Sequence, residues 1–454
     1  TLVFILLTTL NFAQVEYGPF VGGVTETSAV FVLKTFGVQE AEIEYSFTQD
    51  FKYSKKTVIQ STDSVFFYTK IYQSNLVPNK KYYYRAIVDG TPDWKIHSFK
   101  TFPKEKRTNF SFGFGACQQS GYSQWQPTIF PVMAKDSLRL FLQLGDWTYP
   151  DTTERRWNYR FNERKDLLAK AFDSRYSYDY PFGSLILSKT PIAYTYDDHD
   201  FAANNPDGTD KAKANTIEIY KKLFPHYPLA NPDNGIWQKF QFGDVEFFVL
   251  DLRSQRNIND TVSVRRGKFS PPKGHSILAG FEITGQNQRD WLAESLKNST
   301  AKWKVIVSSV IFNQRYIEVF DNDSLKNKFR WITNDAVDKW AGFPEDLQFV
   351  TRTIKENDIQ NVIFVTGDSH SSYIDDGTNS IFPEISSANL DVRNSKLDQR
   401  MSNEGLKIWN KGSYAGDGYA YGRVRFFYEE KDFAILEIVD DKGEIVVSHK
   451  IYAK

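Results

Sequence analysis

This chain of 454 residues contains little cysteine, methionine and histidine, and it lacks a net charge. The only cysteine is Cys117, which excludes a disulfide within the chain. The 56 basic residues balance the 56 acidic ones, so the formal net charge is zero. This balance excludes a global attraction to nucleic acid or to an anionic membrane surface. Affinity for an anionic substrate must therefore come from a local feature, which bound cations could supply.

Long apolar runs are also missing. Beyond the N-terminus, no segment reaches the roughly 18 consecutive apolar residues of a membrane span. Residues 2–10 are mainly apolar, and Asn11-Phe12-Ala13-Gln14 follows them. This pattern predicts that residues 1–14 are the remnant of a secretory signal, cleaved after Ala13, with a buried N-terminal strand as the alternative. We therefore expect a secreted or periplasmic protein without a membrane span.

Aromatic residues are abundant, at 16% of the chain, which favours a β-rich architecture. Residues 15–103 contain short strand-like segments between turn signals and no helical periodicity. They are predicted to form an immunoglobulin- or fibronectin-like β-sandwich domain. This region has a single histidine and no cluster of metal-type residues, so we expect it to pack against or position a second domain.

Residues 104–454 alternate between strand-like and helical patterns, which predicts an α/β domain. Helices are expected at 286–296, capped by Thr284, and at 344–356. A hairpin turn is expected at Asp440-Asp441-Lys442-Gly443. The predicted strands are 110–115, 138–144, 191–196, 245–252, 303–312, 361–366, 422–428, 433–439 and 445–452.

Three clusters of acidic residues each follow one of the short apolar strands. They are Gly145-Asp146-Trp147-Thr148-Tyr149, Tyr196-Asp197-Asp198-His199-Asp200 and Gly367-Asp368-Ser369-His370. Ligands of α/β sheets bind beyond the carboxyl ends of the strands, so these side chains are expected at one rim. Carboxylate and imidazole groups that meet in this way are the donors of a metal centre.

Cys117 follows a fourth strand, 110–115. This position favours a metal thiolate over the alternative, a small buried apolar side chain. Asp146 could bridge two cations, with a solvated turn carboxylate as the alternative. Tyr149, three residues further on, could add a phenolate. Thiolate and phenolate together favour a ferric ion over zinc.

The second cluster places three carboxylates around His199, which costs repulsion unless a cation or a buried proton offsets it. Either Asp197 or Asp198 is expected to be a metal ligand, with Asn205 as a candidate carbonyl donor. His199 suits a general acid that protonates a leaving oxygen. The alternative interpretation is an acidic surface loop.

Asp368 and His370 alternate along an extended chain, so both side chains can face the same metal. After another strand, Arg253 or Arg256 could bind phosphate oxygens. A salt bridge with Asp251 or elsewhere is the favoured alternative, and Arg253 stays the candidate for substrate binding. The other histidines lack acidic neighbours at ligand spacing and are predicted to be structural or at the surface: His97, His226, His275 and His449.

Taken in order, the motifs resemble the alkaline phosphatase D, or PhoD-like, family of exported metallophosphoesterases. The resemblance covers nearly the whole chain, including the N-terminal β-region. The matching residues are Ala116-Cys117-Gln118, Gly145-Asp146 with Tyr149, Asp197-Asp198-His199-Asp200 with Asn204-Asn205, Leu250-Asp251 with Arg253, and Gly367-Asp368 with His370.

The resemblance implies a calcineurin-like α/β/β/α sandwich over residues 104–454 and a centre of iron and calcium ions. Cys117, Asp146 and Tyr149 would hold ferric iron, and Asp146 would bridge to calcium. The ligands that complete the centre, not divided between the ions, would be Asp197 or Asp198, Asn205, Asp368 and His370.

The implied function is hydrolysis of phosphomonoesters or phosphodiesters, phospholipid head groups among them, by a metal-activated hydroxide with His199 as general acid. One alternative is a phospholipase D-type phosphodiesterase with little monoesterase activity. The other is a non-catalytic extracellular binding protein stabilised by calcium, in which the acidic loops hold structural ions and His199 has no acid role.

Overall fold

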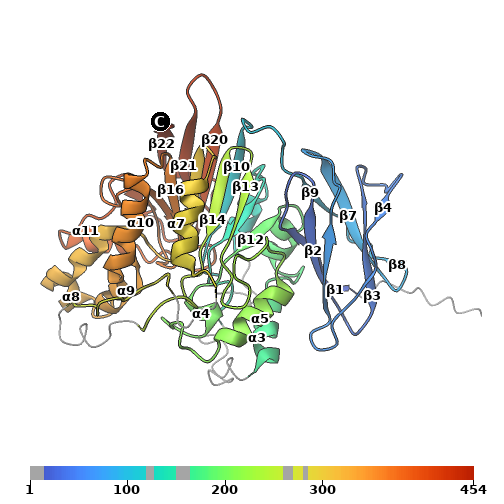
Figure 1. Ribbon diagram of the computed structural model, residues 1–454, viewed down its shortest axis with the longest axis horizontal. Coiled ribbons are helices and arrows are strands. Elements are labelled where there is room, and N and C mark those ends of the chain that lie inside the picture. The colour runs from blue at the N-terminus through green and yellow to red at the C-terminus, as the bar shows by residue number, and fades with distance from the viewer. Residues whose placement is uncertain (1–14, 119–126, 150–163, 259–268, 280–284) are drawn as a thin grey trace, which may run out of the picture.

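Two packed β-sheets with helices on their outer faces form most of the molecule, and an all-β region lies beside them (Figure 1). The computed structural model describes residues 15–118, 127–149, 164–258, 269–279 and 285–454. The predicted signal remnant, residues 1–14, lies outside these ranges. Within them, no helix combines the length and the apolar character that crossing a membrane requires.

The first sheet contains nine strands. β10, β11 and β12 are parallel to one another, and β20 continues the sheet from β10 in the antiparallel direction. The predicted hairpin between the last two strands is present, with Gly443 N donating to the carbonyl of Asp440 at 3.0 Å. The strand order is β22 (Ile445–Tyr452), β21 (Phe433–Asp440), β20 (Ala420–Phe427), β10 (Phe110–Gly115), β11 (Phe141–Gln143), β12 (Ile192–Tyr194), β1 (Val15–Gly22), β2 (Ala29–Thr35) and β6 (Tyr68–Gln73).

The second sheet contains seven strands, of which β14, β15, β16 and β18 are parallel. Two strands end before their predicted limits, at Val249 and Val307. The apolar residues beyond these points are buried under helices, so hydrophobicity alone overestimates the strand length. The order is β13 (Gln238–Phe242), β14 (Val245–Val249), β15 (Trp303–Val307), β16 (Val362–Thr366), β18 (Pro383–Ser387), β17 (Ser372–Asp376) and β19 (Gly412–Ser413).

The inward-facing side chains of the two sheets form one continuous apolar core. The rings of Phe112 and Phe247, one from each sheet, meet edge to face with centroids 5.2 Å apart. Burial of one such side chain stabilises the fold by roughly 1.5–3 kcal/mol. Together with the outer helices, this packing confirms the predicted α/β/β/α sandwich.

Separate apolar clusters join the helices to the outer face of each sheet. The outer face of the first sheet is covered by α1 (Ile129–Met133), α3 (Lys165–Asp173), the π-helix η2 (Phe182–Leu187) and α5 (Lys213–Leu223). The second sheet is covered by α7 (Gln288–Asn298) and α10 (Pro344–Glu356).

Both predicted helices are present, and the bounds of α10 agree with the prediction. The helix α7 is capped by Asn287, whose side chain accepts a hydrogen bond from Asp290 N at 2.9 Å. The predicted cap, Thr284, lies outside the described residues.

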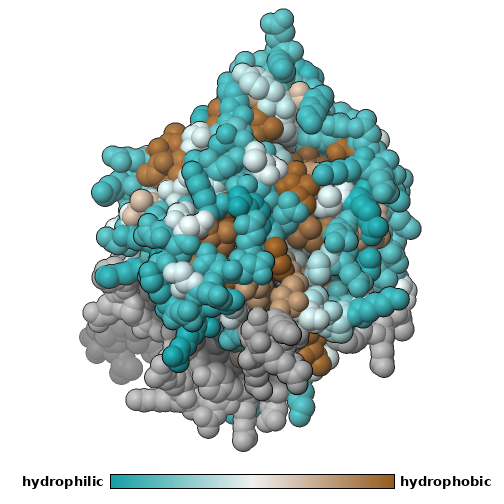
Figure 2. All heavy atoms as spheres, turned by 90° about the vertical axis from the view of Figure 1, so that its left-hand side faces the viewer, coloured by the Kyte–Doolittle hydropathy of each residue, from teal (hydrophilic) through white to brown (hydrophobic). Residues whose placement is uncertain are grey.

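The remaining helices lie near the carboxyl ends of the strands (Figure 1). The helix at the end of β12 is α4 (Asp198–Phe201), and a further helical layer contains η3 (Gln314–Asp321), α8 (Asp323–Lys328), α9 (Ile332–Asp338), η4 (Trp340–Gly342) and α11 (Leu397–Asn403). The face on this side is mostly hydrophilic, with scattered hydrophobic residues (Figure 2).

The N-terminal region is all-β, as the sequence predicts. Strands β1, β2 and β6 face a third sheet, and the rings of Phe31 and Tyr84 pack between them at 4.9 Å. β1 also pairs with β12 in parallel, through Gly22 and Ile192, so the hydrogen-bonded sheet continues across the predicted domain boundary, which stays a prediction. The third sheet consists of β3 (Glu40–Ser46), β4 (Lys55–Lys56), β5 (Gln60–Ser61), β7 (Lys81–Val88), β8 (Thr91–Pro92) and β9 (His97–Lys100).

One carboxyl group, that of Glu384 on β18, is fully buried in the second sheet. Its Oε1 accepts hydrogen bonds from Phe312 N at 3.0 Å and from the Thr366 hydroxyl at 2.9 Å, whereas Oε2 has no hydrogen-bond partner among the described residues. Burial raises the pKa of Glu384 to about 8. The side chain is therefore protonated in the folded state at neutral pH.

Glu384→Gln is expected to increase stability at alkaline pH. Between the ordinary pKa of 4.5 and about 8, the folded state binds a proton that the unfolded state has lost, so the free energy of unfolding falls as the pH rises through this window. Each pKa unit corresponds to roughly 1.4 kcal/mol. Urea unfolding at pH 5 and pH 9 should show the variant gaining on the wild type at pH 9. The exposed-site control Glu356→Gln should show no such gain, and parallel pH profiles for Glu384→Gln would refute the prediction.

Candidate metal centre

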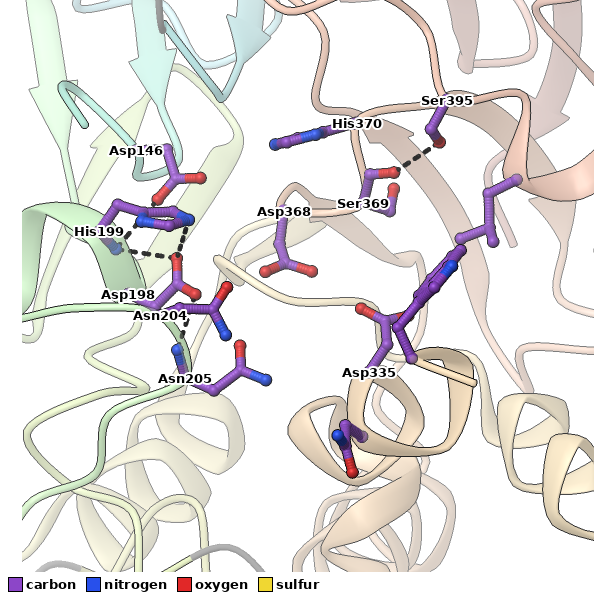
Figure 3. Close-up of a pocket in the computed structure, with 13 residues that line it drawn as sticks. Asp146, Asp198, His199, Asn204, Asn205, Asp335, Asp368, Ser369, His370 and Ser395 are labelled. Carbon is purple, nitrogen blue, oxygen red and sulfur yellow. Dashed lines mark hydrogen bonds and ion pairs between the residues drawn. The ribbon is translucent and has the colours of Figure 1, made fainter. Parts of the chain in front are cut away.

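The carboxyl ends of the parallel strands of both sheets meet at one rim, where most of the predicted site residues gather around a pocket (Figure 3). Cys117, Asp146 and Asp198 follow the adjacent strands β10, β11 and β12. Asp368 and His370 follow β16 of the second sheet. The predicted meeting of distant segments is therefore observed.

The backbone at the rim is unusual. Five of the eight predicted metal ligands have a left-handed conformation, which side chains other than glycine rarely adopt and which costs on the order of 1–3 kcal/mol each. Surrounding structure must impose such strain, and strain of this kind concentrates at functional sites. The φ angles are 66° at Cys117, 51° at Asp146, 53° at Asn205, 71° at Asp368 and 50° at His370.

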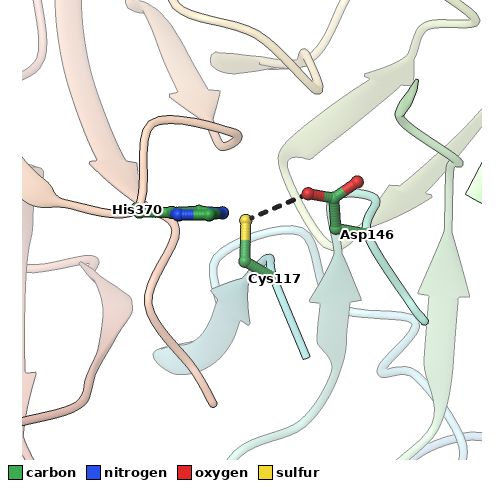
Figure 4. Close-up of side chains that lie close together, drawn as sticks. All are labelled: Cys117, Asp146 and His370. Atoms are coloured by element: carbon green, nitrogen blue, oxygen red, sulfur yellow. Dashed lines mark hydrogen bonds between the residues drawn. The ribbon is translucent and has the colours of Figure 1, made fainter. Parts of the chain in front are cut away.

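Sulfur, oxygen and nitrogen donors are in contact at the first-sheet side of the rim. The Sγ of Cys117 lies 3.4 Å from Oδ2 of Asp146, between this carboxylate and the His370 ring (Figure 4). The Tyr149 hydroxyl donates to the same Oδ2 at 2.5 Å and lies 2.9 Å from Nε2 of His370. Ligand atoms of Cys117, Asp146 and His370 all lie within 4.8 Å of one another. One cation could therefore contact all three.

The two candidate ligands of the second cluster have different surroundings. Asp197 caps α4, and its Oδ1 accepts hydrogen bonds from Arg253 at 2.5 Å and from the Ser309 hydroxyl at 2.8 Å. Asp198 instead lines the pocket, and its Oδ2 accepts the backbone N–H of Asn205 at 2.9 Å. Of the two, Asp198 is thus the carboxylate that faces the cavity.

His199 also lines the pocket. Its ring packs against that of Tyr149 with centroids 4.3 Å apart, and its Nε2 lies 4.0 Å from Oδ1 of Asp198. Its backbone N–H donates to the same Oδ1 at 2.8 Å. These contacts place the imidazole beside the carboxylates, where it could reach a bound substrate.

Three buried acids at the rim hold their protons more tightly than usual, whereas, despite its burial, the pKa of Asp198 is lowered by the charges of His199 and Arg253. Burial, and then the neighbouring carboxylate of Asp198, raises the pKa of Asp146. Burial likewise raises the pKa of Asp368 and of the Cys117 thiol. Burial lowers the pKa of His370 to about 4. The raised pKa values of the three acids reflect a dry site crowded with negative charge, which a bound cation would relieve. The lowered pKa of His370 reflects burial and then the neighbouring His199 imidazole.

The pocket has a volume of about 360 Å³ and a markedly acidic lining. Among its lining residues are four aspartates, Asp146, Asp198, Asp335 and Asp368, and no lysine or arginine. An anionic ligand could not bind these four carboxylates without added positive charge. The donor set and the charge therefore both fit metal ions.

Arg253 lies behind the pocket and is fully buried. Besides Asp197, it donates to Oδ1 of Asp338 at 2.8 Å, and its Nη2 lies 3.5 Å from Asp368. Arg256 donates to the same Asp338 oxygen at 2.6 Å. The salt-bridge interpretation of Arg253 agrees with these contacts, with partners other than Asp251. A contact between Arg253 and substrate stays a prediction.

Helix α9 brings residues to the site that the sequence did not identify. Lys339, directly after α9, is buried and donates to Oδ2 of Asp368. Its Nζ also lies 2.9 Å from Oδ1 of Asp335, four residues earlier. The spacing of an acid and a lysine at i and i+4 is a sequence signal for this pair, although it does not reveal the contact with Asp368. Trp331 and Asn334 line the same wall.

Arg175 is another buried residue that the sequence analysis missed. Its Nε donates to the carbonyl of Trp147 at 2.8 Å, and its Nη2 donates to the carbonyl of Gln118. These carbonyls directly follow Asp146 and Cys117. One guanidinium thus joins the two loops that carry these side chains.

None of the other four histidines lines the pocket, as predicted. His97 is buried, and its ring stacks on Tyr84 with centroids 5.2 Å apart. His275 stacks on Phe343 at 4.4 Å. His226 Nδ1 lies 2.7 Å from the carbonyl of Tyr227, and His449 is on β22.

Comparison with known proteins gives the same family as the motifs. The family model of PhoD-like phosphatases matches residues 112–408. Alkaline phosphatase D of Bacillus subtilis is 27% identical over 326 residues, which cover 66% of this chain and 52% of that protein. Purple acid phosphatase 21 of Arabidopsis thaliana is 34% identical over 113 residues, 24% of each protein. The chain thus spans about half the length of the first relative and about a quarter of the second.

Two solved structures share the fold. A structure of PhoD superposes with a TM-score of 0.69 at 18% identity, covering 98% of this chain and 94% of that one. A purple acid phosphatase from yellow lupin seeds superposes with a TM-score of 0.59 at 11% identity, covering 96% and 74%. Both likenesses include the N-terminal β-region and the two-sheet sandwich.

Proposed function

Because the chain belongs to the PhoD-like phosphatase family, we propose that it is a metal-dependent hydrolase of phosphate esters. The observation that carries this proposal is the cluster of Cys117, Asp146 and His370 donors next to a pocket whose lining is acidic and contains no lysine or arginine. A phosphate ester is an anion, and its binding to such a pocket requires cations.

We assign the ligands by the donor contacts. Cys117, Asp146 and Tyr149 would hold iron, because thiolate and phenolate donors suit a ferric ion. Asp146 would also reach a second ion, calcium, together with Asp198, Asn205 and Asp368. His370 would complete the iron ligands, because its Nε2 lies 2.9 Å from the Tyr149 hydroxyl and its ring nitrogen lies within 4.8 Å of the Cys117 and Asp146 donors. Asp198 is preferred over Asp197 because Asp198 lines the pocket, whereas Oδ1 of Asp197 already accepts hydrogen bonds from Arg253 and Ser309.

When bound, the cations supply positive charge that polarises a phosphoryl group and lowers the pKa of water. The residues of the chain then orient the reactants and move protons. His199 donates a proton to the departing oxygen, since its ring lies at the pocket wall next to Asp198. Lys339, which pairs with Asp335 of α9, holds Asp368 in place.

The proposed substrates are small phosphomonoesters and phosphodiesters, with phospholipid head groups among them, and the proposed location is outside the cytoplasm. Hydrolysis of nitrophenyl phosphate and of its bis-ester separates the two activities. Release that a chelator abolishes, and that added metal restores, supports the enzyme. No release from either ester would favour the calcium-stabilised binding protein instead.

Cys117→Ser is expected to lower the amount of iron that the purified protein retains, because a hydroxyl is a far weaker ligand than a thiolate for this ion. Elemental analysis of wild type and variant, purified without added metal, measures this directly. A buried serine on α7, Ser295→Ala, serves as the control and should retain the wild-type content. An equal iron content in Cys117→Ser and wild type would show that Cys117 is a buried packing residue and not an iron ligand.

A further inference from the structure

A cleft at the junction of the N-terminal β-region and the two-sheet body contains four cationic residues. It has a volume of about 300 Å³ and is built from three segments: β7 and β9, the loop between α1 and β11, and the loop between η2 and β12. Lys81 and Lys100 line it from one side, and Arg139 and Lys189 from the other.

These cations have no matching negative charge. In the described part of the chain, none of the four forms an ion pair within 4.0 Å. The only carboxylate in the lining is that of Asp136. Its Oδ2 already accepts hydrogen bonds from Arg423 at 2.6 Å and from the Tyr421 hydroxyl. In a chain of zero net charge, this local excess of positive charge is unusual.

Arg139 is anchored by contacts of its guanidinium. Its Nη2 donates to the carbonyl of Thr101 at 2.7 Å, and its guanidinium lies 5.1 Å from the ring centroid of Phe242. Its Nε is buried and has no hydrogen-bond partner among the described residues. Burial lowers the pKa of Arg139 to about 10. The pKa of Lys100 is also lowered, first by burial and then by the charges of Arg139 and Lys80. Both groups are thus partly desolvated beside like charges, a cost that a bound anion would offset.

We propose that this cleft is a binding site for a multivalent oxyanion, either inorganic phosphate or the phosphate group of a larger ligand. Ser98, Ser137 and Thr190 also line it and could add hydroxyl donors. A rigid guanidinium among lysines is a combination suited to phosphate oxygens.

The site is separate from the metal centre. Arg139 precedes β11, whereas Asp146 follows it, so the two residues lie at opposite ends of the same strand. At about 3.3 Å per residue, their separation is roughly 20 Å. The cleft therefore does not contact the reacting phosphate, and its ligand would act on the domain junction.

Calorimetric titration of the metal-loaded protein with inorganic phosphate tests the proposal by stoichiometry. The double variant Arg139→Gln/Lys100→Gln should bind one phosphate fewer per chain than the wild type. The matched control Lys273→Gln/Lys297→Gln removes two exposed cations elsewhere and should leave the stoichiometry unchanged. The expected difference of one bound phosphate per chain holds whether or not the metal centre also binds phosphate. Failure of the cleft proposal is therefore distinguishable from failure of the proposed enzyme function.

The single variant Lys189→Gln, at an exposed position, guards against misfolding of the double variant, and it should weaken the same site at least tenfold. A second titration distinguishes free phosphate from a larger ligand. The Asp146→Asn variant, which is expected not to hydrolyse esters, is titrated with glycerol phosphate and with inorganic phosphate. Tighter binding of glycerol phosphate favours a larger ligand, and tighter binding of inorganic phosphate favours the free ion. Equal stoichiometry and affinity in wild type, double variant and Lys189→Gln would overturn the proposal.

Discussion

His199→Gln is expected to lower kcat by about 10²–10⁴-fold while the bound metal content stays unchanged. The imidazole lies at the pocket wall, where its ring packs against that of Tyr149, and the Asp146 carboxylate contacts Cys117 and Tyr149 directly. Its proposed task is to give a proton to the departing oxygen. The loss should therefore be larger for an alkyl ester, whose alcohol is a poor leaving group, than for a nitrophenyl ester.

The comparison of the two esters is the decisive measurement. A matched control is His449→Gln, which removes an imidazole from β22 and should leave both rates unaltered. If His199→Gln slows both esters equally, or does not slow either, the residue is not the general acid. A loss of metal in this variant would assign His199 to the ligand set instead.

Arg253→Met is expected to destabilise the fold by about 3–5 kcal/mol, because it removes one partner of a buried ion network. The side chain has no exposed surface, and its guanidinium contacts Asp197 at 2.5 Å and Asp338 at 2.8 Å. Methionine fills a similar volume and leaves these carboxylates short of positive charge. Arg253→Lys should also be destabilising, since one ammonium cannot make the fork of contacts that the guanidinium makes.

Urea unfolding of wild type and variants in the same buffer measures the effect. Arg164→Met is the control, because its partner Asp166 and Arg164 itself are more than half exposed, and such surface pairs contribute less than about 1 kcal/mol. A loss of similar size in Arg253→Met and Arg164→Met would contradict the interpretation of Arg253 as a structural cation.

Much of the site could be predicted because strand ends are readable in a sequence. Cys117, Asp146 and Asp368 each follow a short apolar segment, and parallel strands place such ends at one rim. The observed meeting of these side chains agrees with that prediction, and their roles as ligands stay to be tested. The family resemblance made the same residues stand out together.

Other features depend on packing that no local pattern encodes. The proposed choice of Asp198 over Asp197 rests on the cap of α4, where one carboxylate lies against Arg253 and the other lines the pocket. Lys339 reaches Asp368 from the end of α9, far along the chain from any strand end. Its role was hidden because a lysine after a helix is ordinarily solvated.

The pairing of Gly22 with Ile192 has a practical consequence for shortened versions of the protein. A fragment beginning near residue 104 would leave β12 as an open edge, with backbone groups free to recruit a strand from another molecule. The exposed segment leads directly into Asp197 and Asp198. Aggregation and damage to the active rim would therefore arise together, and the N-terminal region is best kept in any expressed fragment.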